Sequence, residues 1–226
     1  MENIIEFKVW GPRALFTDPI TKVGGEKCSY PIPTYQALKG ICESIYWKPT
    51  IIWHVDKVRI MNPIKNESVN TKLIKYGNQS EHDLSITTYL YNVCYHVKAH
   101  FEWNQFRPDL EHDRNENKHY FQAKRALEKG GRRDIFLGTR ECQAYVEPCC
   151  FEEGDGAYDK TPDYCFGIEF HGFDYGDENG NNQMVARFWQ PHMEHGIVNF
   201  IRPEDCSIRK FIKEYQPKLV DTEGAF

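Results

Sequence analysis

The stretch TYQALKGICESIYWKPTIIWHVDKVRIM (residues 34–61) decides the fold, because it holds a helix and a strand joined by a short connection. Its first half carries apolar side chains at helical spacing, at Tyr35, Leu38, Ile41, Cys42 and Ile45. Thr34 is placed to cap this helix, and Pro49 ends the pattern. From Ile51 to Met61 apolar and polar residues alternate, which is typical of a strand.

Similar patterns extend outward from this pair in both directions. Residues 4–10 alternate and stop at Gly11-Pro12, so they predict a strand before the helix. After a polar excursion over residues 62–84, the segment 85–101 is dense in Thr, Tyr and Val, which predicts a long strand or a hairpin. A second helix is predicted for residues 118–129, capped by Asn117 and stopped at Gly130-Gly131, and a fourth strand for 135–146, entered through a turn at Gly138.

The resulting order is β-α-β-β-α-β, which indicates an α+β protein with a ferredoxin-like (RRM-like) split unit over residues 1–148. Residues 149–226 read differently, because acidic, turn-rich stretches separate the three strands predicted at 164–173, 184–189 and 197–201. We expect this part to be a small antiparallel β subdomain with a C-terminal tail.

The N-terminus lacks the features of a secretory signal, and no apolar run reaches the length that crosses a bilayer. We therefore expect a cytoplasmic protein without a membrane partner, whose eight cysteines are free thiols. A zinc site built from Cys142, Cys149, Cys165 and His171 does not match the spacing of a closed tetrahedral site, so we expect no metal and no cofactor.

The formal net charge is −5, yet the charge is unevenly distributed. Residues 114–140 carry eight basic and three acidic side chains, a net charge of +5, whereas residues 141–226 carry a net charge of −10. The basic segment is either a footprint for phosphates or an ordinary solvated helix face, and charge alone does not separate the two.

Chemistry is suggested where the second helix begins, at Asn117-Lys118-His119. A helix N-terminus attracts phosphate, an imidazole transfers protons near neutral pH, and an ammonium stabilises a pentacovalent phosphorane. Tyr46 lies just past the apolar stripe of the first helix, and in a split βαββαβ fold the two helix ends can face one cleft. The alternative is that Lys118 and His119 are exposed polar residues and that Tyr46 lies at the core's rim with its hydroxyl in water.

Glycines beside arginines follow the second helix, at Gly130-Gly131-Arg132-Arg133 and at Gly138-Thr139-Arg140. Glycine lets the backbone approach a phosphate that arginine holds, although turn glycines beside incidental arginines are common. The predicted RNA-binding set is Lys124, Arg125, Arg132, Arg133, Gly138 and Arg140.

Five segments together resemble the CRISPR-associated Cas-five family, and more narrowly its type I-C (Dvulg) subtype within the RAMP superfamily. They are IEFKVWGPRALFTDP (5–19), TYQALKGICESIYW (34–47), KHYFQAKRAL (118–127), RRDIFLGTRECQAYVEP (132–148) and DYCFGIEFHGFDYG (163–176). The resemblance covers nearly the whole chain in the expected order.

This resemblance implies a metal-independent endoribonuclease that cuts CRISPR precursor RNA at the base of its repeat hairpin. The 2′-hydroxyl attacks the neighbouring phosphate and leaves a 2′,3′-cyclic phosphate. Its catalytic tyrosine and Lys-His pair correspond to Tyr46, Lys118 and His119. The implied partners are the mature guide RNA and the backbone and large subunits of a type I-C Cascade complex.

Three alternatives remain open at this point. The first is a non-catalytic guide-RNA-binding subunit of Cascade. The second is a generic RRM-like binder that stacks bases on sheet aromatics, for which the candidates are Phe7, Trp53, Tyr89, Tyr91 and Tyr95. The third is binding of double-stranded DNA by the same basic surface.

Overall fold

The computed structural model describes residues 3–75 and 77–216. The helices are α1 (Pro19–Val23), α2 (Tyr35–Ile45), α3 (Glu116–Glu128) and α4 (Gly176–Asn179), with 3-10 turns η1 (Pro108–Asp113) and η2 (Pro203–Asp205). The strands before α3 are β1 (Ile4–Ala14), β2 (Lys27–Cys28), β3 (Ile51–Ile60), β4 (Asn66–Lys75) and β5 (Asn78–Trp103). Those after it are β6 (Ile135–Phe136), β7 (Gln143–Pro148), β8 (Tyr164–Cys165), β9 (Glu169–Asp174), β10 (Gln183–Trp189), β11 (His192–Glu194), β12 (Ile197–Asn199) and β13 (Ile208–Glu214).

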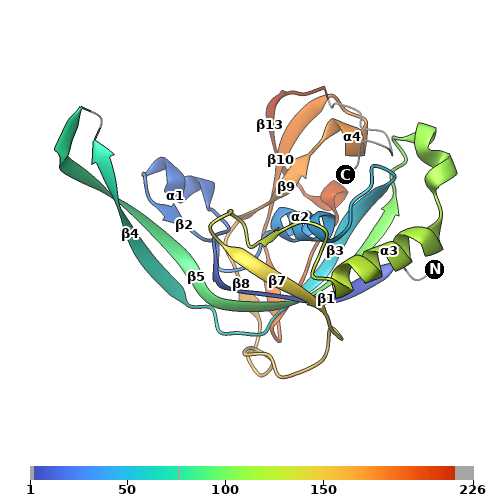
Figure 1. The fold of residues 1–226 in the computed structure, drawn as a ribbon, viewed down its shortest axis with the longest axis horizontal. Helices are drawn as coiled ribbons and strands as arrows, with labels where there is room; N and C mark the ends of the chain where they lie inside the picture. Colours follow the sequence, from blue (N-terminus) through green and yellow to red (C-terminus); the bar gives the residue numbers. More distant parts are fainter. Residues whose placement is uncertain (1–2, 76, 217–226) are drawn as a thin grey trace.

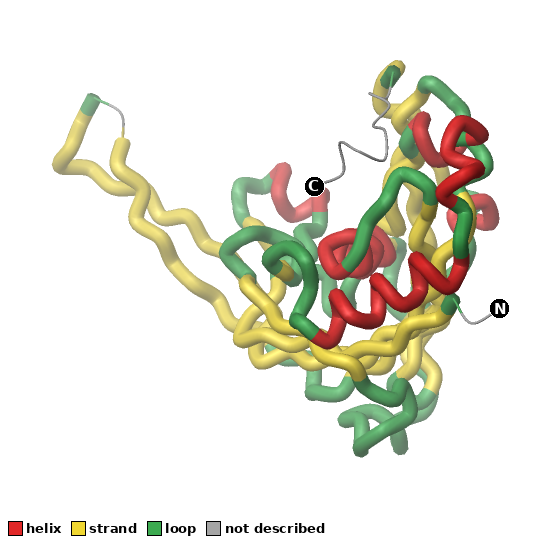
Figure 2. Tube along the Cα trace, turned by 45° about the vertical axis from the view of Figure 1, so that its right-hand side comes forward, coloured by secondary structure: helices red, strands yellow, loops and turns green. Residues whose placement is uncertain are grey.

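The centre of the main sheet has the strand order β7-β1-β5-β3, and each neighbouring pair is antiparallel. In sequence order these are the fourth, first, third and second strands of a βαββαβ unit, with α2 following β1 and α3 following β5. Both helices lie on the same side of the curved sheet (Figure 2). The ferredoxin-like α+β prediction is therefore confirmed.

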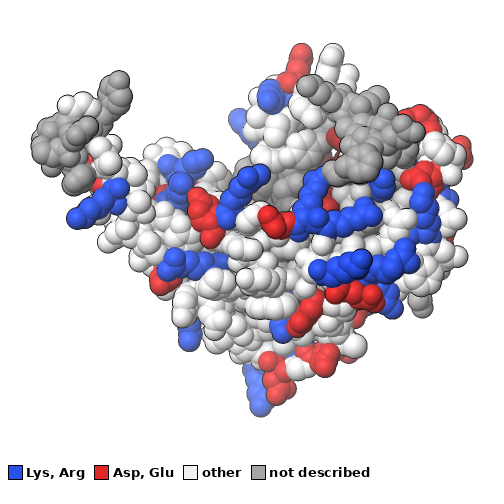
Figure 3. Space-filling model, viewed as in Figure 1, with Lys and Arg blue, Asp and Glu red and all other residues white. Residues whose placement is uncertain are grey.

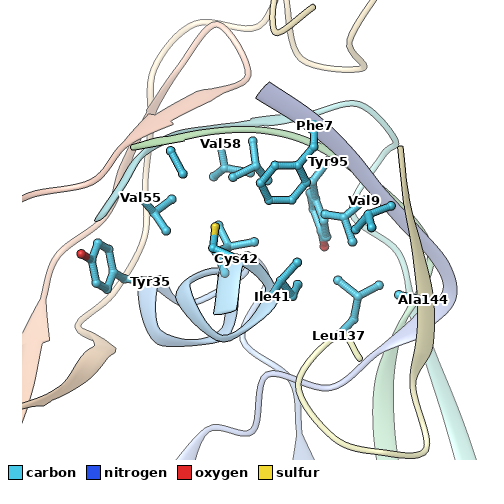
Figure 4. Close-up of a cluster of buried hydrophobic side chains, with 14 of the residues drawn as sticks. Phe7, Val9, Tyr35, Ile41, Cys42, Val55, Val58, Tyr95, Leu137 and Ala144 are labelled. Carbon is cyan, nitrogen blue, oxygen red and sulfur yellow. The ribbon is translucent and has the colours of Figure 1, made fainter. Parts of the chain in front are cut away.

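The core forms between this sheet and α2 (Figure 4). Along β1, Phe7 and Val9 are fully buried, whereas Lys8 between them faces outward to Glu147. The apolar stripe of α2 meets the inner face of the sheet, so Ile41 and Cys42 are also buried. Burial of apolar surface at about 25 cal/mol per Å² is the main stabilising contribution of such a layer.

Three segments differ from their predictions. The strand predicted at 164–173 divides into β8, which joins the main sheet, and β9, which belongs to a separate sheet. Residues 66–75 were expected to belong to a polar excursion, yet they form β4, which pairs with β5 in a long projecting ribbon (Figure 1). Both faces of this ribbon meet solvent over much of its length, so the hydrophobic alternation of a half-buried strand is absent. The strand expected over 135–146 is interrupted, because β6 ends at Phe136 and β7 begins at Gln143.

Gly138 lies in this interruption and has a φ of +94°. A β-carbon at this position would come within 2.0 Å of the Leu15 carbonyl oxygen, and Leu15 N–H donates to the neighbouring Leu137 carbonyl at 2.9 Å. The close approach of two backbone segments therefore explains why glycine is needed here.

The strands after residue 148 fall into two groups. β9, β10 and β13 form a separate three-stranded sheet, whereas β8, β11 and β12 extend the main sheet beyond β3. The three-stranded sheet contacts α2, where the His171 ring stacks on Tyr35 with centroids 4.3 Å apart and Phe173 N–H donates to Gln36 at 3.2 Å. A domain boundary at residue 148 stays a prediction. Among the described residues, no helix is long and apolar enough to cross a membrane.

Candidate active site

Tyr46 lies at the C-terminal end of α2. Its backbone is extended, with φ −156° and ψ 123°, while its N–H still donates to the Cys42 carbonyl at 2.9 Å. The Trp53 indole N–H of β3 donates to the Tyr46 carbonyl at 2.7 Å. These two hydrogen bonds fix where the chain leaves the helix and hold the phenol ring beside the sheet.

The N-terminal end of α3 is capped by Asn115, whose side chain accepts from the Lys118 N–H at 3.1 Å. The prediction of Asn117 as the cap was wrong. Either asparagine suits a cap by residue type, but η1 ends at Asp113 and Asn115 has the extended backbone that a cap requires, so the helix starts at Glu116. Lys118 and His119 consequently both belong to the first turn.

The two helix ends meet, as the topology predicted. Tyr46 Oη lies 2.8 Å from His119 Nδ1 and 3.0 Å from Gln122 Oε1. On the other side of the imidazole, Nε2–H donates to the Asp113 carbonyl at 2.9 Å. His119 therefore has a partner at each ring nitrogen, one from α2 and one from η1.

Asp113 connects the remaining polar groups. One of its carboxylate oxygens pairs with the Lys118 ammonium, and the other accepts from Thr50 Oγ1 at 2.7 Å. That second oxygen also lies 3.4 Å from His119 Nε2. The side chain of Asp113 is buried, so these partners replace the water that a carboxylate would otherwise bind.

The three predicted catalytic residues differ in how far they are buried. Tyr46 and His119 are both 0% exposed, whereas the Lys118 side chain is 45% exposed. Trp103 of β5 packs edge-on against the imidazole with centroids 5.6 Å apart, and the Arg132 guanidinium lies 5.0 Å from the centre of the Tyr46 ring. The interpretation of His119 and the Tyr46 hydroxyl as solvent-facing groups was therefore wrong.

These surroundings shift three pKa values. Burial raises the pKa of Tyr46 to about 12, against the opposing effect of the nearby Arg132 charge. Burial lowers the pKa of His119, against the opposing effect of the Asp113 carbonyl and carboxylate. Burial alone would raise the pKa of Asp113, but hydrogen bonds from Lys118 and Thr50, together with the His119 and Lys118 charges, outweigh it and lower that pKa. Tyr46 is therefore a neutral phenol at physiological pH.

The structure groups some of the predicted RNA-binding residues and separates others. Arg125 and Arg132 line one hollow of about 440 Å³ beside α3, and Arg132 and Arg133 line a second hollow of about 590 Å³ against β7. Lys124 lines a different hollow with β1, and Arg140 lies in the β6–β7 connection. Figure 3 shows basic side chains gathered over the position of α3, with acidic ones below them.

Other sequence-based candidates lie elsewhere. Phe7, Trp53 and Tyr95 are buried in the core, so they do not form an open stacking surface of the RRM kind. Within residues 3–75 and 77–216, the group of potential metal ligands close enough to share an ion is Asp163, His192 and Glu194, which are exposed on and near β8 and β11. The four residues considered for zinc do not form such a group there.

Sequence reasoning missed Asp113, Thr50 and Gln122. Gln122 could have been predicted from its spacing, because it lies three positions after His119 and so shares its helix face. Asp113 and Thr50 carried no comparable signal, since their contacts depend on how η1 packs against the start of β3.

The β7-β1-β5-β3 sheet with α2 and α3 on one face is the α+β fold of the RAMP superfamily. A family model described as CRISPR-associated protein (Cas_Cas5), of the Cas5d type, matches residues 4–201. The chain belongs to this CRISPR-associated Cas5 family.

Two curated relatives are named CRISPR pre-crRNA endoribonuclease Cas5d. The one from Mannheimia succiniciproducens is 45% identical over 69 residues, which are 30% of each chain. The one from Thermus thermophilus is 32% identical over 160 residues, which are 67% of each chain. The matched part thus spans less than a third of the first relative and about two thirds of the second.

Two solved structures are similar over 92% of this chain and 96% of their own. One is described as a CRISPR-associated protein, with a TM-score of 0.76 and 35% identity. The other is a functionally uncharacterized protein from Streptococcus mutans, with a TM-score of 0.75 and 36% identity.

Proposed function

We propose that this chain is a metal-independent endoribonuclease that cuts CRISPR precursor RNA at the base of the repeat hairpin. The observation that carries the proposal is the contact between Tyr46 and His119, from two different helices, beside the solvent-facing Lys118. Two relatives named CRISPR pre-crRNA endoribonuclease support the endoribonuclease part of the proposal.

The reaction follows from the groups present. The 2′-hydroxyl oxygen attacks the adjacent phosphorus, the bond from phosphorus to the 5′-oxygen breaks, and a 2′,3′-cyclic phosphate and a 5′-hydroxyl result. Lys118 stabilises the charge on the phosphorane, and His119 gives a proton to the leaving 5′-oxygen. Because the pKa of Tyr46 is about 12, its neutral hydroxyl orients the 2′-hydroxyl and the proton of that group passes to water.

RNA must reach two groups that are buried in this structure. Two exposed cations lie beside them: Lys118, which contacts the same carboxylate as His119, and Arg132, over the Tyr46 ring. In our proposal the scissile phosphate binds between these cations and draws Arg132 away from the ring. Arg125 and Arg133 extend the path along the two hollows, and Lys124, Gly138 and Arg140 contact more distant phosphates.

The proposed partners follow from the same assignment. The chain retains the mature guide RNA and joins the backbone and large subunits of a type I-C Cascade complex in the cytoplasm. Double-stranded DNA is a second ligand for the basic surface, because phosphate contacts do not depend on the sugar.

The test is cleavage of a labelled repeat hairpin in EDTA. We expect the wild type to cut at the hairpin base and His119→Ala to be slowed about a hundredfold or more, because loss of a general acid typically costs 10²–10⁴. His112→Ala is the matched control, since His112 is an exposed histidine on η1, and it should cut normally.

A non-catalytic guide-RNA-binding subunit is the second candidate. It is favoured by the complete burial of His119 and by the occupation of both ring nitrogens within the protein. Tight binding of the matching hairpin by the wild type without cleavage would establish this candidate in place of the nuclease.

A further inference from the structure

We propose that Asp113 is a positioning residue that holds the Lys118 ammonium and the His119 imidazole in their working geometry. The inference rests on the proposed nuclease function and adds a residue to it. Asp113 touches both side chains from η1, an element outside the two helices that carry the predicted site. It acts on the reaction through these two residues.

The geometry around Asp113 leaves its carboxylate little freedom. Thr50, which is 1% exposed and lies just before β3, donates to one oxygen, and Lys118 pairs with the other. The peptide carbonyl of Asp113 accepts from both Asn115 N–H, at 2.8 Å, and His119 Nε2–H, at 2.9 Å. Asp113 thus contacts both the N-cap residue of α3 and the side chains of Lys118 and His119, so it links the start of the helix to the orientation of these two side chains.

The carbonyl contact decides which nitrogen carries the exchangeable proton. A carbonyl oxygen only accepts, so Nε2 keeps its hydrogen in the neutral and in the charged imidazole. The proton that a general acid gives up is therefore the one on Nδ1, which faces Tyr46 Oη at 2.8 Å. In the charged form Nδ1–H donates to Tyr46 Oη, and the Tyr46 hydroxyl donates to Gln122 Oε1 at 3.0 Å, so every donor has an acceptor.

The carboxylate supplies the charge that this imidazolium requires. Besides Asp113 from η1, the charged groups acting on His119 are Lys118 on α3 and Lys48 after α2, and both are cations. The Tyr46 phenol and the Phe101 and Trp103 rings of β5, which also contact His119, are neutral. Without the Asp113 charge, the hydrogen bond to the Asp113 carbonyl remains, but the charges acting on the imidazolium are those of cations, and burial adds its cost.

The experiment compares Asp113→Asn with Asp109→Asn. Both changes remove one carboxylate from η1, but the Asp109 side chain is 57% exposed and pairs with Arg107 instead of the site. Histidine ring nitrogens are followed by NMR during a pH titration of each folded protein. We expect the pKa of His119 to fall by about one unit in Asp113→Asn and to stay unchanged in Asp109→Asn.

Cleavage kinetics provide the second readout. In Asp113→Asn we expect kcat to fall about ten- to a hundredfold with little change in KM, because the loss is confined to the transition state. The fall in rate toward high pH should also begin at a lower pH, since the imidazolium is the active acid. In the double variant, Asp113→Asn should lower kcat further than His119→Ala alone by only a small factor. That factor is the part of the Asp113 effect that acts through Lys118.

Specific outcomes would overturn the inference. An unchanged His119 pKa, a loss of equal size in Asp109→Asn, or fully additive effects of Asp113→Asn and His119→Ala would each reduce Asp113 to a structural role. If Asp113→Asn does not fold, Thr50→Val is used in its place. It keeps the Asp113 charge but removes one hydrogen bond to the carboxylate. We expect kcat to fall, by less than the fall expected for Asp113→Asn. A wild type that never cleaves would refute the nuclease, whereas the pKa comparison would still decide whether Asp113 controls His119.

Discussion

At the residue scale, the Tyr46 hydroxyl is the group on which the two helices converge. It contacts His119 Nδ1 and Gln122 Oε1 in a fully buried position, and its ring lies beneath the Arg132 guanidinium. A hydroxyl with two protein partners contributes to stability as well as to chemistry, because its removal leaves both partners without a hydrogen bond.

Tyr46→Phe should therefore lower the free energy of unfolding by about 1–3 kcal/mol, the usual cost of leaving buried polar groups unpaired. Urea denaturation monitored by tryptophan fluorescence measures the change. Tyr91→Phe on β5 is the control, because the Tyr91 side chain is 47% exposed, and it should leave stability nearly unchanged. Equal stability of Tyr46→Phe and the wild type would mean that the hydroxyl does not form this network in solution.

At the scale of the element, the start of α3 positions the Lys118-His119 pair. Asn115 caps the helix through the Lys118 N–H, so the cap and a proposed catalytic residue share one hydrogen bond. A helix that began after Asn117, as the sequence pattern suggested, would change the place of His119 relative to the first turn and to the end of α2.

Asn115→Ala should destabilise the protein by about 1 kcal/mol, the typical loss on removing an N-cap side chain. Asn117→Ala should change stability much less, because Asn117 is an exposed residue at the second position of α3. Thermal unfolding of the two variants shows whether Asn115 or Asn117 caps α3, because the variant that loses the cap has the lower unfolding temperature. A larger loss in Asn117→Ala would mean that the cap lies where the sequence suggested.

At the scale of the whole molecule, the three-stranded sheet contacts the rest of the fold through β9. Its first residue, Glu169, is 3% exposed, and burial together with the nearby Asp18 raises the pKa of its carboxyl to about 8. The folded protein therefore keeps this proton between about pH 4.5 and pH 8, where the unfolded chain has already released it.

The sign of the pH effect follows from this proton. Stability contributed by Glu169 is lost as the pH rises from 4.5 toward 8, by about 1 kcal/mol per pH unit, and then levels off. Glu169→Gln should be increasingly more stable than the wild type across this range in urea denaturation. Glu214→Gln, an exposed change on β13 of the same sheet, should show no such trend, and a constant difference for Glu169→Gln would contradict the raised pKa.

Prediction from sequence succeeded where a local pattern had one structural meaning. The stripe of α2 and the alternation of β1 and β3 each require a buried face, which is why the βαββαβ order was readable. It failed at β4, where a ribbon exposed on both faces carries no such pattern, and at the cap of α3, where two asparagines were equally suitable.

By itself, the sequence determined the ferredoxin-like topology and the basic segment around α3, because these depend on residue type and short-range spacing. The catalytic roles of Tyr46, Lys118 and His119 stay predictions. The tertiary structure alone decided that His119 is buried and that Asp113 and Thr50 belong to its surroundings. Tyr46 and His119 are 73 positions apart, and Thr50 and Asp113 are 63 positions apart. Contacts over such separations arise from the order of strands in the sheet, which places the end of α2, the start of β3 and the start of α3 side by side.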